Sequence, residues 1–195
     1  TAKDFLYLLV SLLNPANKDM QFPLIFTEHA ESRSYFDEID GFIAATLGDE
    51  ARSLYTIIVD DPAAVASEVK AGIKQVKRFR IENGDAFYFN WLLKIEHAFQ
   101  LPFVANHDNM RSLELYRDME PHELAANLRR AFSGIVAGNV KSEAMQLIQE
   151  EGLFEMHGDD SIMTAMDQLL QSFVKQKRMK ISSEDYQPCY RIVHG

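Results

Sequence analysis

The sequence has a single cysteine, Cys189, among its 195 residues. One cysteine cannot form an internal disulfide, and it has no CxxC partner for a metal or redox site. The sequence also lacks a basic segment followed by an apolar one ahead of its first helical pattern, which a secretory signal would require. These absences lead us to expect a cytoplasmic protein in a reducing compartment.

Long apolar runs and an excess of positive charge are absent as well. The longest nearly unbroken apolar run, residues 5–13, has nine residues, about half of the ~20 that cross a bilayer. We therefore expect no membrane partner. Lys and Arg number 20 against 29 Asp and Glu, a formal net charge of -9. This shortage of cations argues against a nucleic-acid partner, so any anion site must be local.

Familiar catalytic and metal-binding motifs are missing too. The six histidines are scattered, at positions 29, 97, 107, 122, 157 and 194. No cluster of them has the spacing of a metal site. The chain contains neither a Gly-x-Ser-x-Gly elbow nor a glycine-rich phosphate loop,. We expect no metal and no other cofactor, and the residues alone show no complete catalytic set.

The residues that are present indicate an α/β protein. The composition, with 47% hydrophobic residues, nine Gly and six Pro, is that of an ordinary globular chain,. Helical spacing is found at residues 1–13, 35–47 and 62–73, and short apolar runs of strand length at 23–27 and 55–60,. The order α-β-α-β-α with continuous apolar strands is typical of a doubly wound parallel sheet. Two strands form only the trailing half of such a sheet, so we expect the leading half upstream.

The remaining residues, 76–195, are predicted to form a mainly helical accessory domain. Helices are expected at 121–136, 141–150 and 161–179, and a strand at 186–193,. An aromatic run at 86–95 fits an extended segment and a helix about equally well. Its residues 88–91 could stack a nucleobase, although aromatic stripes more often belong to a core. The predicted division is therefore 1–75 and 76–195.

The turn from Thr1 to Asp4 is the first candidate for chemistry, since it opens the first helix as a capping box,. A helix start has exposed N–H groups and positive partial charge, which suit a phosphate, and Asp4 would lie beside such a ligand. The same residues also fit a plain N-cap followed by a carboxylate that matches the helix dipole. Both interpretations stay open at the level of the residues.

Basic residues gather at three places in this acidic chain, residues 77–80, 129–130 and 175–180. The last group suits cations in a final helical turn. Arg129 and Arg130 instead lie inside a predicted helix and are followed by serine and glycine, which would let a ligand or another backbone approach. The alternative is an arginine pair on a solvated face. Adjacent helical residues point about 100° apart, so the two arginines cannot both face the same side. We expect Arg130 to lie farther toward solvent than Arg129, and the two guanidinium groups either to splay around one ligand or to reach different partners.

Several stretches resemble a known family. They are TAKDFLYLL at the start, NPANKD at 14–19, GDAFYFNW at 84–91, LRRAFSGIVAGNVK at 128–141, and RMK and PCY in the tail. They are similar to the C-terminal part of the bacterial pyrimidine/purine nucleotide 5'-monophosphate nucleosidases, long-chain members of the LOG or "lysine decarboxylase-like" family. The resemblance covers essentially the whole chain. It implies a Rossmann-like domain, with residues 1–75 as its C-terminal half, and hydrolysis of the N-glycosidic bond of nucleoside monophosphates to a free base and ribose 5-phosphate.

The resemblance also implies roles for two residues. Thr1 matches the threonine of the family motif Pro-Gly-Gly-x-Gly-Thr-x-x-Glu, and it would bind the substrate phosphate. Asp4 stands where the family usually has its catalytic glutamate, and its side chain is shorter by one methylene. The implied mechanism requires no metal or redox cofactor, because a carboxylate can stabilise an oxocarbenium-like transition state.

For the second segment the resemblance implies a homo-oligomer, a dimer or a tetramer, and an alarmone nucleotide as a candidate effector. Arg129, Arg130 and Lys141 have the charge that such a nucleotide requires. A function of a different class stays open beside the enzymatic one. In it, residues 76–195 form a non-catalytic module that senses a nucleotide or builds an oligomer.

Overall fold

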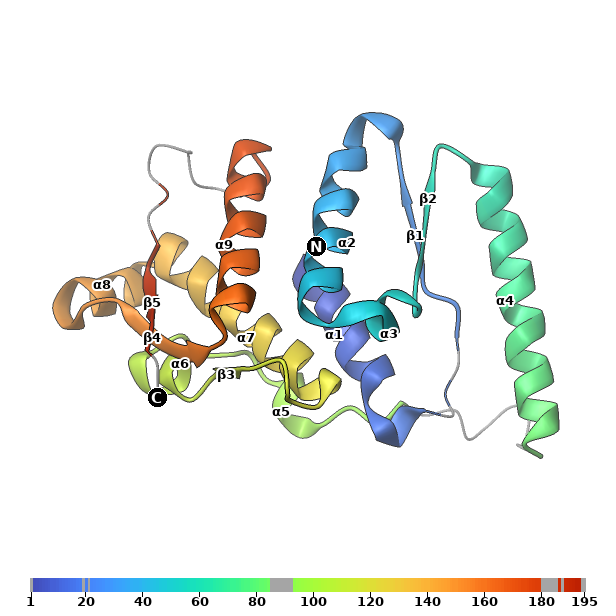
Figure 1. Ribbon diagram of the computed structural model, residues 1–195, viewed down its shortest axis with the longest axis horizontal. Coiled ribbons are helices and arrows are strands. Elements are labelled where there is room, and N and C mark those ends of the chain that lie inside the picture. Colours follow the sequence, from blue (N-terminus) through green and yellow to red (C-terminus); the bar gives the residue numbers. More distant parts are fainter. Residues whose placement is uncertain are drawn as a thin grey trace.

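The computed structural model describes residues 2–18, 20, 22–84, 93–179, 186 and 188–193 (Figure 1). The first part of the chain contains α1 (Ala2–Leu13), a 3-10 turn η1 (Pro15–Asn17), β1 (Ile25–Glu28), η2 (Ala30–Ser32), α2 (Arg33–Thr46), α3 (Gly48–Arg52), β2 (Thr56–Val59) and α4 (Pro62–Glu82). The second part contains α5 (His97–Gln100), α6 (His107–Arg111), β3 (Glu114–Leu115), α7 (Pro121–Val140), α8 (Ser142–Glu151), β4 (Phe154–Gly158), α9 (Asp160–Lys175) and β5 (Tyr190–Ile192).

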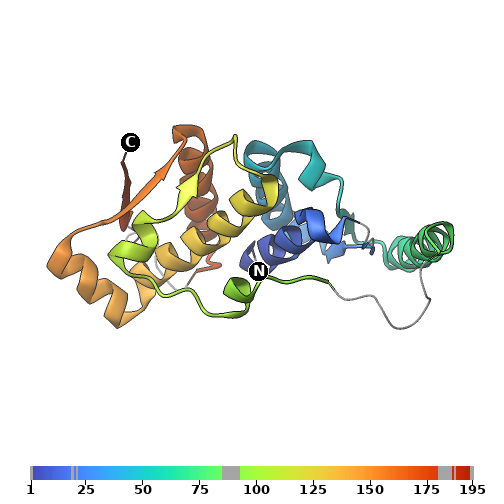
Figure 2. The ribbon, with the colours of Figure 1, turned by 90° about the horizontal axis from the view of Figure 1, so that it is seen from below.

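Strands β1 and β2 form a parallel pair, in register from Ile25 opposite Thr56 to Glu28 opposite Val59. The structure thus confirms the expected α/β class, with parallel strands followed by a mainly helical part. Helix α4 covers one side of this pair and stands at the right-hand end of the molecule in Figures 1 and 2. No helix in the described ranges is long and apolar enough to span a bilayer.

Helix α4 extends farther than the sequence pattern indicated. It begins at Pro62, where the Asp61 side chain accepts a hydrogen bond of 2.8 Å from the Ala64 N–H, as an N-cap residue does. It then continues across position 76 to Glu82. Neither proline nor glycine interrupts residues 73–83, and the first positive φ after the start of α4 is at Gly84. The basic residues 77–80 therefore belong to this helix rather than to a new segment.

The second part contains a parallel sheet that the sequence pattern revealed only at its last strand. Its strand order is β3-β4-β5, and the tail strand was predicted within 186–193. Strand β4 buries Phe154 and Met156 on one face, but it is too short for this alternation to be distinctive. Of the aromatic run 86–95, residues 86–92 lie outside the described residues, and 93–95 belong to neither a helix nor a strand.

One contiguous hydrophobic core joins the two parts of the chain. Helix α1 lies along α7, and α2 packs against α9 (Figure 2). On its other side α1 meets the β1–β2 pair, where the Phe5 and Phe26 rings stack with centroids 4.4 Å apart. Contacts on both sides explain why α1 has almost no polar face. Burying each such large side chain stabilises the fold by about 1.5–3 kcal/mol.

The turn after α1 is fixed to a distant segment by Asn17. This buried side chain donates to the carbonyls of Ser11 (2.8 Å) and Lys94 (2.9 Å), and it accepts from the Lys94 N–H (2.7 Å). Three hydrogen bonds satisfy the buried amide, which would otherwise be costly to desolvate. Asn17 lies in the stretch 14–19 that resembles the nucleosidases, and its role in this structure is to hold the backbone of residue 94.

Candidate functional site

Asp4 is exposed on the first turn of α1. Thr1, the residue predicted to bind phosphate, lies outside the described residues. In Figure 1 α1 runs downward from its N-terminal end, whereas β1 and β2 run upward. The first turn of α1 therefore lies toward the edge at which the parallel strands end, which is where open α/β sheets bind their ligands.

Tyr35 lies close to this first turn, and the sequence pattern gave no sign of a functional role for it. Burial raises the pKa of Tyr35, and the Asp4 carboxylate adds a smaller upward effect. The Arg178 guanidinium and the Ala2 N–H both oppose this rise in the Tyr35 pKa. The start of α1 is thus surrounded by a carboxylate, a neutral phenol and a cation. Arg178 lies in the RMK stretch quoted above and in the basic group 175–180, which were the two signals for it in the sequence.

Arg129 and Arg130 contact different aromatic rings. The Arg129 guanidinium carbon lies 5.0 Å from the centroid of the Tyr7 ring of α1. That of Arg130 lies 4.7 Å from the centroid of the Phe99 ring. Both side chains are half-buried. Arg130 is the residue expected to lie farther toward solvent. Burial lowers the pKa of its guanidinium group, and the Glu96 carboxylate opposes this change.

The two arginines also line a cavity of about 310 Å³ between α7 and the segment from α5 to α6. Asn109, Ser112 and Asn127 supply further polar groups to it. Lys141 caps the C-terminal end of α7, and it is not among the described residues that line this cavity. Eleven positions separate it from Arg130, or ~16 Å along a helix. The structure therefore brings Arg129 and Arg130 together and leaves Lys141 apart from them.

The glycines that follow the arginine pair face protein side chains. A Cβ atom added at Gly138 would lie 2.8 Å from Cys189 Sγ and 2.8 Å from Ile148 Cδ1. One added at Gly134 would meet the Met110 side chain. The small residues of α7 therefore admit neighbouring parts of the core, and they explain the close packing of α7 against α6, α8 and the tail.

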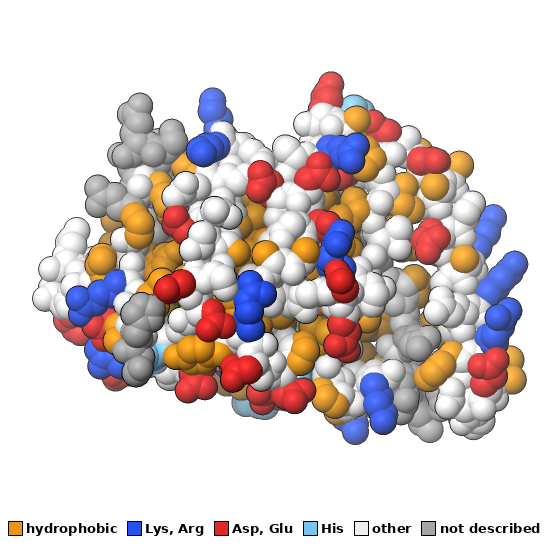
Figure 3. All heavy atoms as spheres, in the orientation of Figure 1, with side chains coloured by type: hydrophobic (Ala, Val, Ile, Leu, Met, Phe, Trp, Pro, Cys, Tyr) orange, Lys and Arg blue, Asp and Glu red, His pale blue; other side chains and the backbone are white. Residues whose placement is uncertain are grey.

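The remaining charged residues form a mixed surface. In the space-filling view, acidic and basic side chains alternate over the face that α9 and α2 present, and cations follow the outer edge of α4 (Figure 3). Within the described ranges, no group of three or more His, Cys, Asp or Glu residues could hold a metal ion.

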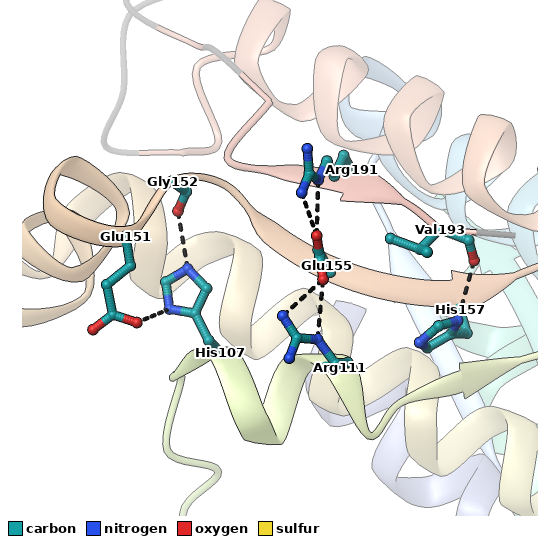
Figure 4. Close-up of polar contacts among 8 residues, drawn as sticks. All are labelled: His107, Arg111, Glu151, Gly152, Glu155, His157, Arg191 and Val193. Carbon is teal, nitrogen blue, oxygen red and sulfur yellow. Dashed lines mark hydrogen bonds and ion pairs between the residues drawn. The ribbon is translucent and has the colours of Figure 1, made fainter. Parts of the chain in front are cut away.

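A polar network of residues from α6 to the tail joins the strands of the second sheet (Figure 4). Glu155 of β4 lies between two cations. Arg111 donates to it at 2.8 and 3.0 Å, and Arg191 donates from the other side. The hydrogen bonds from Arg191 and then Arg111 hold the pKa of Glu155 below its usual range. This network ties α6 and β5 to β4, and the sequence pattern did not predict it because its members are far apart in the chain.

His107 makes a second connection in the same region. Its Nε2 atom lies 3.0 Å from the carbonyl oxygen of Gly152, and its Nδ1 atom lies 3.4 Å from a Glu151 carboxylate oxygen. The ring also meets Phe154 edge to face. Gly152 itself has a φ of 93° and ends α8, a backbone conformation that favours glycine. His107 is thus a structural residue that fastens α6 to the end of α8.

Comparison with known proteins gives a consistent result. Residues 73–193 match the family described as "Pyrimidine/purine nucleotide monophosphate nucleosidase, C-terminal". The chain is also similar to the pyrimidine/purine nucleotide 5'-monophosphate nucleosidases of Escherichia coli strain K12 and of Escherichia coli O157:H7. Each is 50% identical over 192 residues, which are 98% of this chain and 42% of the relative.

These matches agree with the resemblance noted in the sequence. The chain spans 42% of the length of the curated relatives it matches. The family match extends over more than half of the 195 residues, and it includes α7 with its arginine pair and the whole second sheet. The chain therefore belongs to the family of pyrimidine/purine nucleotide monophosphate nucleosidase C-terminal regions.

Proposed function

We propose that the chain is part of a nucleotide 5'-monophosphate nucleosidase of the LOG family, an oligomeric cytoplasmic enzyme. It hydrolyses the N-glycosidic bond of a nucleoside monophosphate and releases a free base and ribose 5-phosphate. The observation that carries this proposal is the exposed Asp4 carboxylate on the first turn of α1. It occurs in a chain that is 50% identical to proteins named as such nucleosidases.

Asp4 is the proposed working carboxylate. Cleavage of the glycosidic bond develops positive charge on the sugar, which a nearby carboxylate stabilises while it orients the attacking water. Because Asp4 is exposed, its carboxylate is accessible to a substrate and a water molecule. The aspartate side chain is one methylene shorter than that of glutamate. The sugar must therefore lie closer to the helix, by roughly the length of that methylene.

The substrate phosphate is proposed to bind at Thr1 and the N–H groups that open α1, where the helix dipole favours an anion. Binding energy from the phosphate would then hold the sugar in place against Asp4, although the phosphate takes no part in bond cleavage. No glycine-rich loop lies within the 195 residues. Hence, in this proposal, the rest of the phosphate site comes from another part of the protein.

A second candidate function is nucleotide sensing by Arg129 and Arg130. Both line the 310 Å³ cavity, and the burial that lowers the pKa of Arg130 also strengthens its attraction to an anion,. An alarmone nucleotide has the negative charge and the aromatic base that this cavity, with its adjacent Phe99 ring, could accept. Lys141 would have to contact a different part of such a ligand, or a neighbouring subunit.

The enzymatic proposal is tested with the full-length protein and a panel of purine and pyrimidine nucleoside monophosphates. We expect stoichiometric release of free base and ribose 5-phosphate, with nucleosides that lack the phosphate hydrolysed far more slowly. Release of inorganic phosphate instead of free base would contradict the proposal, because it would show cleavage of the ester rather than of the glycosidic bond. Binding of nucleotides without turnover would favour the sensing function.

A further inference from the structure

A second cavity, of about 470 Å³, lies beside the start of α1. It is enclosed by the first turn of α1, by α2, by α7 and by the end of α9 with the residues that follow. Its volume falls within the range of cavities that bury a small organic ligand. Ala2 and Lys3 line it, whereas Asp4 is not among its described lining residues.

Most of the cavity wall is apolar. Val136 and Val140 come from α7, Leu170 and Phe173 from α9, and Met179 from the segment after α9. These side chains offer no hydrogen bonds to a ligand. Among the described lining residues, Tyr35 is the only uncharged polar side chain. A ligand with many hydrogen-bonding groups, such as a nucleobase, would lose its water contacts here without replacing them.

Two cations, Lys3 and Arg178, complete the wall. The Arg178 guanidinium carbon lies 4.8 Å from the centroid of the Tyr35 ring. On the α9 side the Tyr35 ring stacks on Phe173, with centroids 5.2 Å apart and an interplanar angle of 29°. This arrangement of Phe173, Tyr35 and Arg178 places a planar positive group next to an aromatic platform. Such a pair attracts an aromatic ring and an anionic group together.

We propose that this cavity is a binding site for a small ligand with an apolar aromatic body and one acidic group. The apolar wall receives the rings, and Lys3 and Arg178 pair with the carboxylate or sulfonate. This cavity differs from the proposed substrate site in that Asp4 is not among its described lining residues. It shares the first turn of α1 with that site, so a bound ligand would contact the residues between Thr1 and Asp4.

The test uses the full-length protein and two fluorescent probes with the same ring system. 8-Anilinonaphthalene-1-sulfonate carries the acidic group, and N-phenyl-1-naphthylamine lacks it. We expect saturable binding of both probes, with the sulfonate binding more tightly. Arg178→Gln should lower the affinity for the sulfonate probe about tenfold or more, since it removes a charge-assisted contact. The same variant should change the affinity for the uncharged probe less than twofold. Lys175→Gln changes an exposed side chain at the end of α9 that is not among the described lining residues, and it should alter neither affinity.

Val136→Trp tests the location, because the larger side chain fills the cavity. This variant should bind each of the two probes at least tenfold more weakly than the wild type does. Circular dichroism checks its folding, and if it fails to fold, Val140→Phe replaces it, since Val140 lines the same cavity but is 41% exposed. Absence of saturable binding to the wild type would overturn the proposal. Unchanged probe affinity in the cavity-filling variant would also overturn it. So would an equal loss of affinity for the two probes in Arg178→Gln. None of these outcomes depends on nucleosidase activity.

Discussion

The Arg129 guanidinium lies over the ring of Tyr7, with its central carbon 5.0 Å from the ring centroid. This contact joins α7 to α1, the helix whose first turn carries Asp4. The same two helices pack along each other through apolar residues. Arg129 is therefore placed to influence both the stability of the interface and any anion in the neighbouring cavity.

Arg129→Ala separates these two roles when it is compared with Tyr7→Leu. If Arg129 binds a nucleotide, its loss should weaken nucleotide binding by about 1.5–3 kcal/mol, the scale of a charge-assisted hydrogen bond. Tyr7→Leu removes the cation–π contact but keeps an apolar side chain against the core, and it should cost about 0.5–2 kcal/mol of stability with nucleotide affinity unchanged. Calorimetric titration and thermal melts measure both quantities. Equal affinity in Arg129→Ala and wild type, or binding that is insensitive to salt, would assign this arginine to the structure alone.

Asp4→Asn in the full-length protein tests the proposal that Asp4 is the catalytic carboxylate. We expect kcat to fall by about two orders of magnitude or more, the scale for losing a positioned charged group, with little change in Tm. Asp4→Glu keeps the carboxylate and should retain most of the activity. If Asp4 only matches the helix dipole, Asp4→Asn should instead cost about 0.3–1 kcal/mol of stability and leave turnover nearly intact.

The isolated chain provides a further test. Residues 1–195 contain no glycine-rich phosphate loop, so we predict that this polypeptide alone does not hydrolyse nucleoside monophosphates, whereas the full-length protein does. Release of free base is followed for both proteins at equal molar concentration. Comparable rates would show that the phosphate site lies within these residues and would refute the proposed placement.

Stability should depend on pH through Asp40. This carboxylate accepts hydrogen bonds from Arg52 at 2.8 Å and from Tyr55 at 2.6 Å. Burial by itself would raise the pKa of Asp40, but the bonds from Arg52 and Tyr55 outweigh it and lower this pKa. Because the pKa is lower in the folded state, the stabilisation is present above about pH 4 and is lost as the pH falls through the folded value.

The corresponding variant is Asp40→Asn, which should destabilise the protein by about 1 kcal/mol at pH 7, since the ion pair is partly exposed,. The difference in Tm between variant and wild type should shrink as the pH is lowered toward 3. A difference that stays constant over this range would show that Asp40 acts through its shape rather than its charge. The comparison variant is Asp49→Asn, at a highly exposed carboxylate 3.8 Å from the same Arg52 guanidinium, and it should cost less stability than Asp40→Asn.

Two glycines in helices should respond in opposite ways to alanine. At Gly138 the new Cβ would lie 2.8 Å from two core side chains, so we expect Gly138→Ala to cost about 1–3 kcal/mol through overpacking. At Gly41, within α2, nothing lies within 4 Å of the new atom. Gly41→Ala should therefore stabilise the protein by about 0.5–1 kcal/mol through helix propensity. Chemical denaturation measures both, and a stabilised Gly138→Ala would contradict the close packing of α7.

Much of the local structure could be predicted from short-range chemistry. Pro15 ends α1, Asp61 and Pro62 open α4, and Gly152 ends α8, because each acts on the backbone within a few residues,. The β-branched run at 55–60 contains β2, and parallel pairing followed from the alternation of strands with helices,. The position of Asp4 on a first helical turn was likewise predictable. Strand β4 was missed because five residues are too few for a clear period.

Other features were decided only by the tertiary structure. The sequence indicated that α1 must be buried, but only the packed chain shows that α7, more than a hundred residues later, covers it. Likewise, Tyr35 lines one cavity together with Phe173 and Arg178, although more than a hundred residues separate it from them in the chain. Helix caps and turns depend on residues that are neighbours in the chain. Contacts between distant residues depend on how the apolar faces of all the helices and strands pack together. For this reason the sequence determined most of the helices, the first two strands, the family and the place of Asp4 on a first helical turn, and the fold decided the second sheet, the partners of the arginines and the second cavity.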